Sequence, residues 1–401
     1  MRPCLTVAAL APVALAATVA TPSYRTSLID LHKALVTTPS ISGNENTIGN
    51  FLVDYLTGRG YVVATQHVEP LEGMPDAGPR FNVVAWKGEN LNRPRVMVTS
   101  HIDVVPPHIE YGIDDGDITK DTMITGRGTV DAKGSVASMI IAANNLMSTG
   151  SVDNEDIMLL FVVGEEISGD GMRAFSRAAS KSTDLPVFSA AIFGEPTENK
   201  LACGHKGGLF CQLSAYGKAG HSSYPWLGKS ANEVTIKALA KIMETDLGSS
   251  EIYGNTTVNV GRFDGGVASN VIAEKTNVGM MIRVAIGPEK VGAELVRERM
   301  LAILNEVDDE AFELDCPKGY GFVASNCDVQ GFETTAVNYG TDIPNLDGDY
   351  TRYLYGPGTI FVAHGANENV TVGDLETAVE GYQRLILHAL HKAGRGEPLE
   401  L

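Results

Sequence analysis

Val96-Met97-Val98-Thr99-Ser100-His101-Ile102-Asp103 is an apolar run that ends in a histidine and an aspartate two residues apart. Its β-compatible residues, bounded by Arg93-Pro94-Arg95, predict a strand. Residues i and i+2 of an extended chain point to the same side, so His101 could face a site while Asp103 holds its second ring nitrogen. A metal-bound imidazole usually needs such a partner. The simpler alternative is a strand end with two solvated side chains.

Strand patterns alternate with helix patterns over most of the chain. The run 157–163 is continuously apolar and the run 188–193 is apolar except for Ser189, as in strands buried on both faces. The helical stripe at 48, 51, 52, 55 and 56 predicts a helix that ends at Gly58 or Gly60. We expect further strands over 61–66, 81–86 and 359–364, and helices over 139–147 and 375–390. This alternation predicts an α/β sheet covered on both faces.

The order of strand and helix patterns changes between about residue 206 and residue 324. Strand patterns occur at 207–216, 256–260 and 278–284, and helical patterns occur at 231–242 and 295–304. The order β-α-β-β-α is typical of a small antiparallel α+β domain. We therefore expect a domain of residues 206–324 inserted into a main domain of residues 21–205 and 325–401.

The composition excludes some classes of partner. The chain has 401 residues, 44% of them apolar, and a formal charge of -18. Such an acidic chain is not expected to bind nucleic acid or an anionic membrane surface.

The N-terminus has the pattern of a secretory signal. Met1-Arg2 precedes an uncharged, largely apolar run from 3 to 20, with small residues before possible cleavage after Ala16 or Ala20. A buried N-terminal helix is the alternative, but Pro12 suits it poorly. We expect residues 1–20 to be removed and the protein to be secreted.

Four cysteines follow this segment: Cys203, Cys211, Cys316 and Cys327. An even number permits two disulfides in a secreted protein, and the local pairs 203–211 and 316–327 are one of three connectivities. Free buried thiols are the alternative. Asn255 and Asn369 begin glycosylation acceptor patterns, and Asn369 is expected to be less accessible because it lies near His364.

Histidines and carboxylates follow the predicted strands at five points: His101, Asp131, Glu165-Glu166, Glu195 and His364. Ligands of an open α/β sheet bind outside the carboxyl ends of its strands. Each position alone is also typical of a solvated loop or turn. Together, two imidazoles and several carboxylates suit a pair of borderline metal ions such as Zn²⁺.

These positions lie in motifs that resemble a known family, the co-catalytic zinc carboxypeptidases and deacylases. That family includes glutamate carboxypeptidase, acetylornithine deacetylase, succinyl-diaminopimelate desuccinylase and aminoacylase. The motifs are Ser-His101-Ile-Asp103, Gly-Arg-Gly-Thr-Val-Asp131-Ala-Lys-Gly, Gly-Glu165-Glu166, Gly-Glu195-Pro-Thr and His364-Gly-Ala-Asn-Glu. The resemblance implies a zinc-peptidase-like mixed sheet with helices on both faces and an inserted ferredoxin-like lid.

The resemblance also assigns roles at the metal centre. Asp131 would bridge two Zn²⁺ ions per subunit, which Co²⁺ or Mn²⁺ could replace. His101 and Glu195 would complete one site, and Glu166 and His364 the other. Glu165 would be the general base that takes a proton from the attacking water, and Asp103 would orient His101.

Three lid residues match family positions that contact substrate. His221, in Gly220-His221-Ser222-Ser223, would help to stabilise the oxyanion, often from a partner subunit, which implies a homodimer through the lid. Asn270 and Arg283 would hold the substrate carboxylate, since an arginine fork binds a carboxylate at two points. The alternatives are a surface histidine, a turn residue and a surface charge.

Position 195 favours one branch of the family. Dipeptidase and tripeptidase members usually have aspartate there, whereas this chain has Glu195, as the carboxypeptidases and deacylases do. The sequence therefore predicts a secreted di-zinc hydrolase of an amide bond beside a free carboxylate, in a peptide or an N-acyl-amino acid. The alternatives are an aminopeptidase or dipeptidase on the same metal core, and a non-catalytic binding protein.

Overall fold

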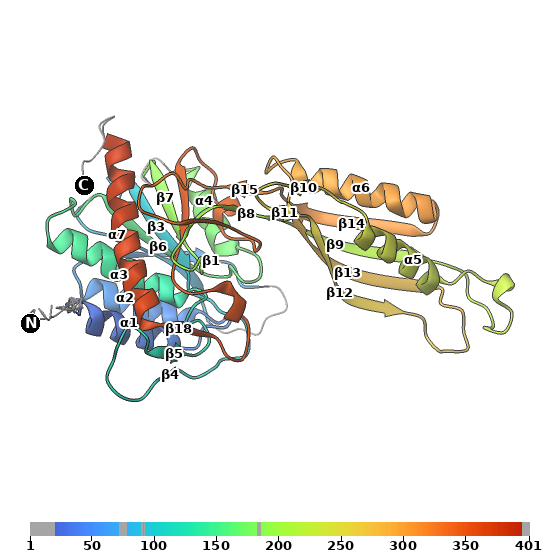
Figure 1. The fold of residues 1–401 in the computed structure, drawn as a ribbon, viewed down its shortest axis with the longest axis horizontal. Helices are drawn as coiled ribbons and strands as arrows, with labels where there is room; N and C mark the ends of the chain where they lie inside the picture. Colours follow the sequence, from blue (N-terminus) through green and yellow to red (C-terminus); the bar gives the residue numbers. More distant parts are fainter. Residues whose placement is uncertain (1–20, 72–77, 90, 92, 183–185, 395–401) are drawn as a thin grey trace, which may run out of the picture.

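The computed structural model describes residues 21–71, 78–89, 91, 93–182 and 186–394, which form two domains (Figure 1). The predicted signal segment, residues 1–20, lies outside the described residues. Figure 1 shows a large domain that contains the first and the last described residues and a narrower domain that extends away from it.

The large domain is built around one mixed sheet. Its strands lie in the order β1-β2-β6-β3-β7-β17-β8-β15, and β16 pairs with β8. The strands of this sheet are β1 (Val62–Val68), β2 (Arg80–Trp86), β3 (Val96–His101), β6 (Ile157–Val162), β7 (Ala190–Gly194), β8 (Leu201–His205), β15 (Val323–Ala324), β16 (Thr334–Val337) and β17 (Thr351–Tyr355). A smaller sheet has the order β18-β5-β4, with β4 (Gly112–Ile113), β5 (Met123–Thr125) and β18 (Asn369–Thr371).

Strand β3, which ends in His101, lies in the middle of the large sheet. It pairs in parallel with β6 on one side and with β7 on the other. Parallel strands end at the same edge of a sheet, so the residues that follow β3, β6 and β7 are brought together there. This arrangement places the site.

Helices cover both faces of the sheet, as predicted. The helices of this domain are α1 (Arg25–Thr37), α2 (Asn46–Thr57), α3 (Lys133–Ser148), α4 (Asp170–Ala179), α7 (Val372–Gly394) and the short η2 (Ile343–Asn345) and η3 (Ile360–Val362). Val98 of β3 and Ile140 of α3 belong to one buried cluster, whereas Met97 of β3 and Phe175 of α4 belong to another. The side chains of β3 thus alternate between two apolar cores, because successive residues of a strand face opposite sides.

The prediction of a strand over residues 359–364 is wrong. Among the described residues, the only strand-like pairing of this segment is an isolated bridge between Thr359 and Thr197. The short helix η3 follows it. Phe361 is 87% exposed, and His364 has a left-handed backbone (φ 62°). The β-branched and aromatic residues favoured a strand locally, but β17 occupies the place beside β7 instead.

The second domain is the predicted antiparallel α+β lid. Its main sheet has the order β12-β13-β9-β14, and its helices α5 and α6 share one core with that sheet. The elements are β9 (Gly207–Tyr216), η1 (Pro225–Leu227), α5 (Ala231–Glu244), β10 (Ser249–Ser250), β11 (Gly254–Asn255), β12 (Thr257–Gly265), β13 (Lys275–Val284), α6 (Gly292–Val307) and β14 (Phe312–Gly319). β15 belongs to the large sheet, so the lid ends before residue 323.

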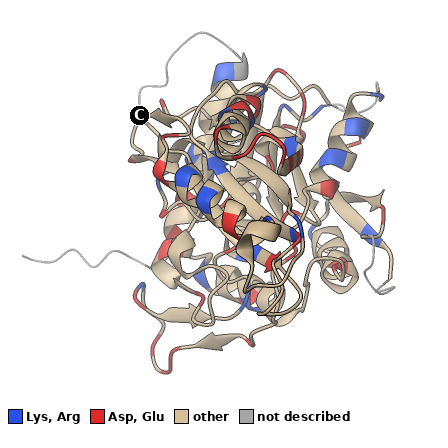
Figure 2. Cartoon of the chain, turned by 90° about the vertical axis from the view of Figure 1, so that its right-hand side faces the viewer, with Lys and Arg blue, Asp and Glu red and all other residues tan. Residues whose placement is uncertain are grey.

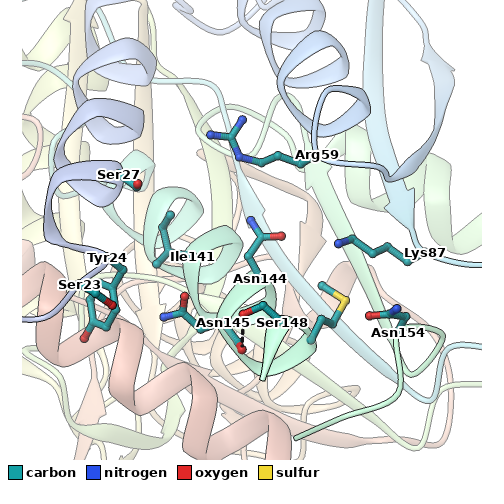
Figure 3. A pocket seen from close by; sticks show the side chains of 11 residues that line it. Ser23, Tyr24, Ser27, Arg59, Lys87, Ile141, Asn144, Asn145, Ser148 and Asn154 are labelled. Carbon is teal, nitrogen blue, oxygen red and sulfur yellow. Dashed lines mark hydrogen bonds between the residues drawn. The ribbon is translucent and has the colours of Figure 1, made fainter. Parts of the chain in front are cut away.

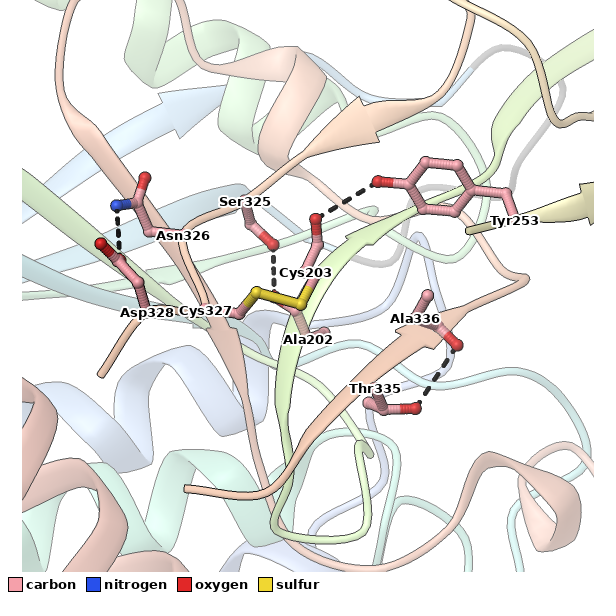
Figure 4. The surroundings of a disulfide bond; sticks show 9 residues. All are labelled: Ala202, Cys203, Tyr253, Ser325, Asn326, Cys327, Asp328, Thr335 and Ala336. Carbon is pink, nitrogen blue, oxygen red and sulfur yellow. Dashed lines mark hydrogen bonds between the residues drawn. A yellow bond between two sulfur atoms is a disulfide. The ribbon is translucent and has the colours of Figure 1, made fainter. Parts of the chain in front are cut away.

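The disulfides differ from the local pairs considered above. One bond joins Cys203 to Cys327, across 124 residues (Figure 4), and the other joins Cys211 to Cys316, across 105 residues. Cys203 and Cys211 lie on successive strands that run in extended conformation, and about eight extended residues span some 25 Å, too far for a disulfide. Each bond instead joins the chain that enters the lid to the chain that leaves it.

The surface of the described residues carries mixed charge. Figure 2 shows the lid end of the molecule, with lysine and arginine interspersed among aspartate and glutamate. In the part of the chain that the structure covers, no helix combines the length and apolar character needed to cross a bilayer. The absence of nucleic-acid and membrane partners stays a prediction.

Candidate active site

The ends of three neighbouring strands and two loops supply the site. His101 is the last residue of β3, Glu165 and Glu166 follow β6, and Glu195 follows β7. Asp131 comes from the glycine-rich loop before α3, and His364 follows η3. The predicted positions therefore meet at the carboxyl edge of the sheet.

Asp131 lies between the two histidines. Its Oδ1 is 3.1 Å from His101 Nε2, and its Oδ2 is 3.2 Å from His364 Nε2. The two remaining carboxylates divide in the predicted way: Glu195 Oε1 is 3.9 Å from His101 Nε2, and Glu166 Oε2 is 3.0 Å from His364 Nε2. One aspartate with an imidazole and a glutamate on each side is the arrangement of a bridged two-ion centre.

Asp103 holds His101 and the Glu165-Glu166 turn by hydrogen bonds. His101 Nδ1 is 2.9 Å from the Asp103 carbonyl oxygen and 3.6 Å from its Oδ1, so the backbone is the nearer partner. The carboxylate accepts hydrogen bonds from Ser42 Oγ (2.7 Å) and from the backbone N–H groups of Glu165 (3.1 Å) and Glu166 (3.3 Å). Asp103 therefore fixes the Glu165-Glu166 turn as well as the imidazole.

The crowded carboxylates have perturbed protonation. Removal from water and the nearby Glu195 raise the pKa of Glu165 well above its usual range. Burial alone would lower the pKa of His101, but hydrogen bonds to Asp103 and Asp131 raise it well above that of free imidazole. Hydrogen bonds to Asp131 and Glu166 raise the pKa of His364 to about 10. The cluster thus attracts positive charge strongly.

A metal ion fits these residues. Ligand atoms of His101, Asp131 and Glu166 lie within 4.8 Å of one another. Glu166 Oε1 is buried and has no hydrogen-bond partner, although buried carboxylate oxygens are normally satisfied. Imidazole and carboxylate donors also suit zinc and related ions.

Two residues beside the centre were not predicted from the sequence. Asp342 is buried, its Oδ2 has no hydrogen-bond partner, and burial raises its pKa to about 6. Tyr339 donates a hydrogen bond to the carbonyl oxygen of Pro196 (2.8 Å), beside Glu195. Both come from the loop after β16, where Tyr339-Gly-Thr-Asp342 gives only a weak turn signal.

The structure does not bring the three predicted lid residues together. His221 and Asn270 lie on adjacent loops, since Ser222 N donates to Asn270 O (3.1 Å), and both side chains are exposed. Figure 1 places these loops at the end of the lid remote from the large domain. Arg283 lies at the other end of β13, some 30 Å away along the strand. One lid therefore cannot present Asn270 and Arg283 to the same carboxylate.

Arg283 lies at the base of the lid and faces the large domain. It is paired in register with Gly208, the second residue of β9. A Cβ atom added to Gly340 would be 3.4 Å from Arg283 Nη1, and Gly340 is two residues before Asp342. The guanidinium is thus close to the loop that borders the metal ligands.

A large cavity elsewhere does not carry this chemistry. It has a volume of about 560 Å³ and is lined by residues at the start of α1, residues of α3 and residues that follow α2 and β2 (Figure 3). Its described lining includes Arg59, Lys87 and Asn144, with no carboxylate and no histidine. This lining therefore lacks the ligands and the general base of the centre described above.

Comparisons with known proteins show the family of the chain. Residues 97–388 match the model of peptidase family M20/M25/M40. A peptidase M20 domain-containing protein of Sordaria macrospora is 55% identical over 92% of this chain and 86% of its own length. A probable carboxypeptidase of Aspergillus fumigatus is 43% identical over 91% of this chain and 87% of its own length.

Solved structures of low identity share the fold. A tripeptidase of Staphylococcus aureus has a TM-score of 0.72 and 21% identity, with 91% of this chain and 98% of that chain covered. A dinuclear metal binding peptidase of Bacillus subtilis has a TM-score of 0.62 and 15% identity, with 92% and 99% covered. The range matched by the family model, residues 97–388, contains the positions His101, Asp131, Glu165, Glu166, Glu195 and His364. The chain belongs to the M20/M25/M40 family of metal-dependent peptidases.

Proposed function

We propose that this peptidase is a secreted zinc-dependent hydrolase of amide bonds that lie beside a free carboxylate. Its substrates are peptides, cleaved at the C-terminus, or N-acyl-amino acids. The observation that carries the proposal is the position of Arg283, a cation that faces the loop bordering the metal ligands. Glu195, where the carboxypeptidase and deacylase branch has glutamate, supports the same substrate class.

The metal ions in this proposal are two zinc ions. His101, Asp131 and Glu195 would hold one, and Asp131, Glu166 and His364 the other. When bound, they would polarise the scissile carbonyl and lower the pKa of water. Co²⁺ or Mn²⁺ would serve as replacements, because both accept nitrogen and oxygen donors.

The other steps belong to side chains. Glu165 accepts the proton of the attacking water and returns it to the leaving nitrogen, and its raised pKa suits a carboxylate that must hold a proton between these steps. Arg283 binds the substrate carboxylate and sets the distance of the amide from Glu165. The Asp103 carboxylate keeps Glu165 in place by accepting a hydrogen bond from the backbone N–H of Glu165.

The substrate class is tested with one dipeptide in three forms: free, C-terminally amidated and N-acetylated. Amidation removes the charge that Arg283 binds, so kcat/KM should fall by tens to thousands-fold, or ~2–5 kcal/mol. N-acetylation should leave cleavage intact, and Arg283→Met should abolish the difference between the free and amidated forms. Rates are read by mass spectrometry.

An aminopeptidase on the same metal core would show the reverse dependence. It would cleave the amidated form as fast as the free one and leave the acetylated form intact. That result would replace the carboxypeptidase proposal. A non-catalytic protein would cleave none of the three.

We also propose a homodimer formed through the lid. β12 is an edge strand of the lid sheet, and an unpaired edge is a template for pairing with another chain. Large apolar side chains are exposed on the same domain: Trp226 is 74%, Ile236 58% and Met243 59% exposed. Pairing of two lids would cover this surface and bring one lid tip toward the other subunit.

Secretion has independent support from the cysteines. Both disulfides join distant parts of the chain, and such bonds persist in oxidising compartments. Asn255 is exposed and Asn369 is half-buried, so Asn255 is the better candidate for a glycan. We expect protein recovered from the culture medium to begin after Ala16 or Ala20 by N-terminal sequencing. An intact Met1 in that fraction would contradict signal cleavage.

A further inference from the structure

A buried ion pair, Arg127–Glu368, lies directly behind the metal ligands. The two side chains are 2% and 1% exposed, and Arg127 Nη1 is 2.6 Å from Glu368 Oε2. Neither residue was assigned a role by the sequence analysis, although Glu368 ends the His364 motif. The mechanism proposed above does not use them either.

Glu368 holds the loop that carries Asp131. Its Oε1 accepts hydrogen bonds from the backbone N–H groups of Gly128 (2.9 Å), Val130 (3.2 Å) and Asp131 (3.3 Å). Three donors on one oxygen fix the direction in which this loop runs. The Asp131 carboxylate is thereby aimed between the two imidazoles.

Arg127 holds the loop that carries His364. Its Nη2 donates to the His364 carbonyl oxygen (3.4 Å), and its Nε donates to the Pro107 carbonyl oxygen (3.2 Å). His364 has a left-handed backbone and lies outside the sheet, so regular strand pairing does not hold it. A residue in that conformation persists only when its surroundings constrain it.

We propose that Arg127 and Glu368 are a positioning pair that fixes Asp131 and His364 at the separation a two-ion centre requires. This inference rests on the metal centre proposed above. Glu368 acts mainly on Asp131, and Arg127 links that loop to His364. The pair touches neither substrate nor water in the mechanism, so its effect passes through the ligands.

The test compares Glu368→Gln with a matched control, Glu376→Gln. Glu376 is also 1% exposed and is paired with Arg25, but this pair joins α7 to α1 and holds no metal ligand. Glutamine at position 368 keeps one acceptor oxygen. Its N–H₂ group, however, is a donor and cannot accept hydrogen bonds as the second carboxylate oxygen does. Co²⁺ affinity, measured by titration of metal-free protein, should fall about 10–100-fold in Glu368→Gln and stay within about twofold in Glu376→Gln.

Hydrogen exchange gives a second readout without any metal. In the metal-free protein, the amides of Gly128, Val130 and Asp131 should exchange about tenfold faster in Glu368→Gln than in the wild type. The control should leave these amides unchanged. Thermal unfolding of both variants shows whether each is folded at the temperature of the measurement.

Arg127→Lys separates the two halves of the pair. Lysine keeps a charge for Glu368 but loses the fork that reaches His364 O. One Co²⁺ should therefore bind as in the wild type while the second binds about tenfold more weakly. Loss of both ions together would contradict this division.

The outcomes distinguish this inference from the proposed function. Wild-type protein that binds no Co²⁺ would overturn the metal centre, and the amide exchange would still decide whether Glu368 orders the loop. Wild-type protein that binds two ions, with Glu368→Gln unchanged in affinity and exchange, would overturn the positioning pair alone. Equal losses in Glu368→Gln and Glu376→Gln would also overturn it, because they would indicate a general cost of losing a buried ion pair.

Discussion

Replacement of Glu165 by glutamine should lower kcat by about 10²–10⁴-fold, the scale for loss of a general base. The purified variant should still contain about two zinc ions per chain after zinc saturation, as the wild type should. Glutamine has the size of glutamate but cannot accept the proton. Metal analysis and steady-state kinetics on the same preparation check both statements.

The positions of the carboxylates explain why Glu165 is expected to act as a base and not as a metal ligand. Among the five predicted ligands, each imidazole is approached by carboxylates other than Glu165: Asp131 and Glu195 at His101, and Asp131 and Glu166 at His364. Glu165 instead has its backbone N–H tied to Asp103 and its pKa raised by burial and by Glu195. A carboxylate with a raised pKa, held close to the ligands without being one of them, is suited to accept and return a proton.

Glu166→Gln is the matched control for this prediction. Glu166 is adjacent in sequence and has the same chemistry, but its Oε2 is 3.0 Å from His364 Nε2. Its replacement should weaken metal binding by about 10-fold or more, with kcat partly restored by added zinc. If Glu165→Gln loses metal and Glu166→Gln keeps it, the two roles are exchanged.

Much of the centre could be predicted because its residues follow buried strands. The apolar runs at 96–98, 157–163 and 188–193 identify β3, β6 and β7, and their parallel pairing brings His101, Glu165 and Glu195 to one edge. Local pattern and sheet geometry agree there. The division of Asp131 between two imidazoles came from the family resemblance, and the distances match it.

The wrong strand over residues 359–364 and the open question of the cysteine pairs both concern places where tertiary partners decide the structure. Residues 359–364 have strand composition, but no free sheet edge receives them, so they form η3 and a left-handed turn at His364. The cysteine pairs depend on which strands are neighbours: Cys211 and Cys316 lie on β9 and β14, which pair although they are far apart in sequence. Spacing along the chain does not show which distant strands become neighbours.

His221→Ala should lower kcat by about 10²–10³-fold, the scale for loss of one oxyanion donor, with metal content unchanged. The side chain is exposed at the lid tip. The length of β9 alone, about 30 Å, separates it from the end of the lid that joins the large domain. Such a residue reaches a metal centre only through a large movement of its own lid or from a second subunit. Unchanged kcat would leave His221 as a surface histidine.

A heterodimer decides between these two routes. One subunit carries His221→Ala and the other Glu165→Gln, each with a different tag, so that the mixed species can be purified. If the lid tip serves the partner, one of the two sites has both Glu165 and His221, and activity should be about half that of the wild type. If each lid serves its own subunit, neither site is complete, and the heterodimer should be as inactive as the two single-variant homodimers. The first outcome would also explain why Asn270 and Arg283 lie at opposite ends of one lid, since a closed site would take Arg283 from its own subunit and Asn270, beside His221, from the partner.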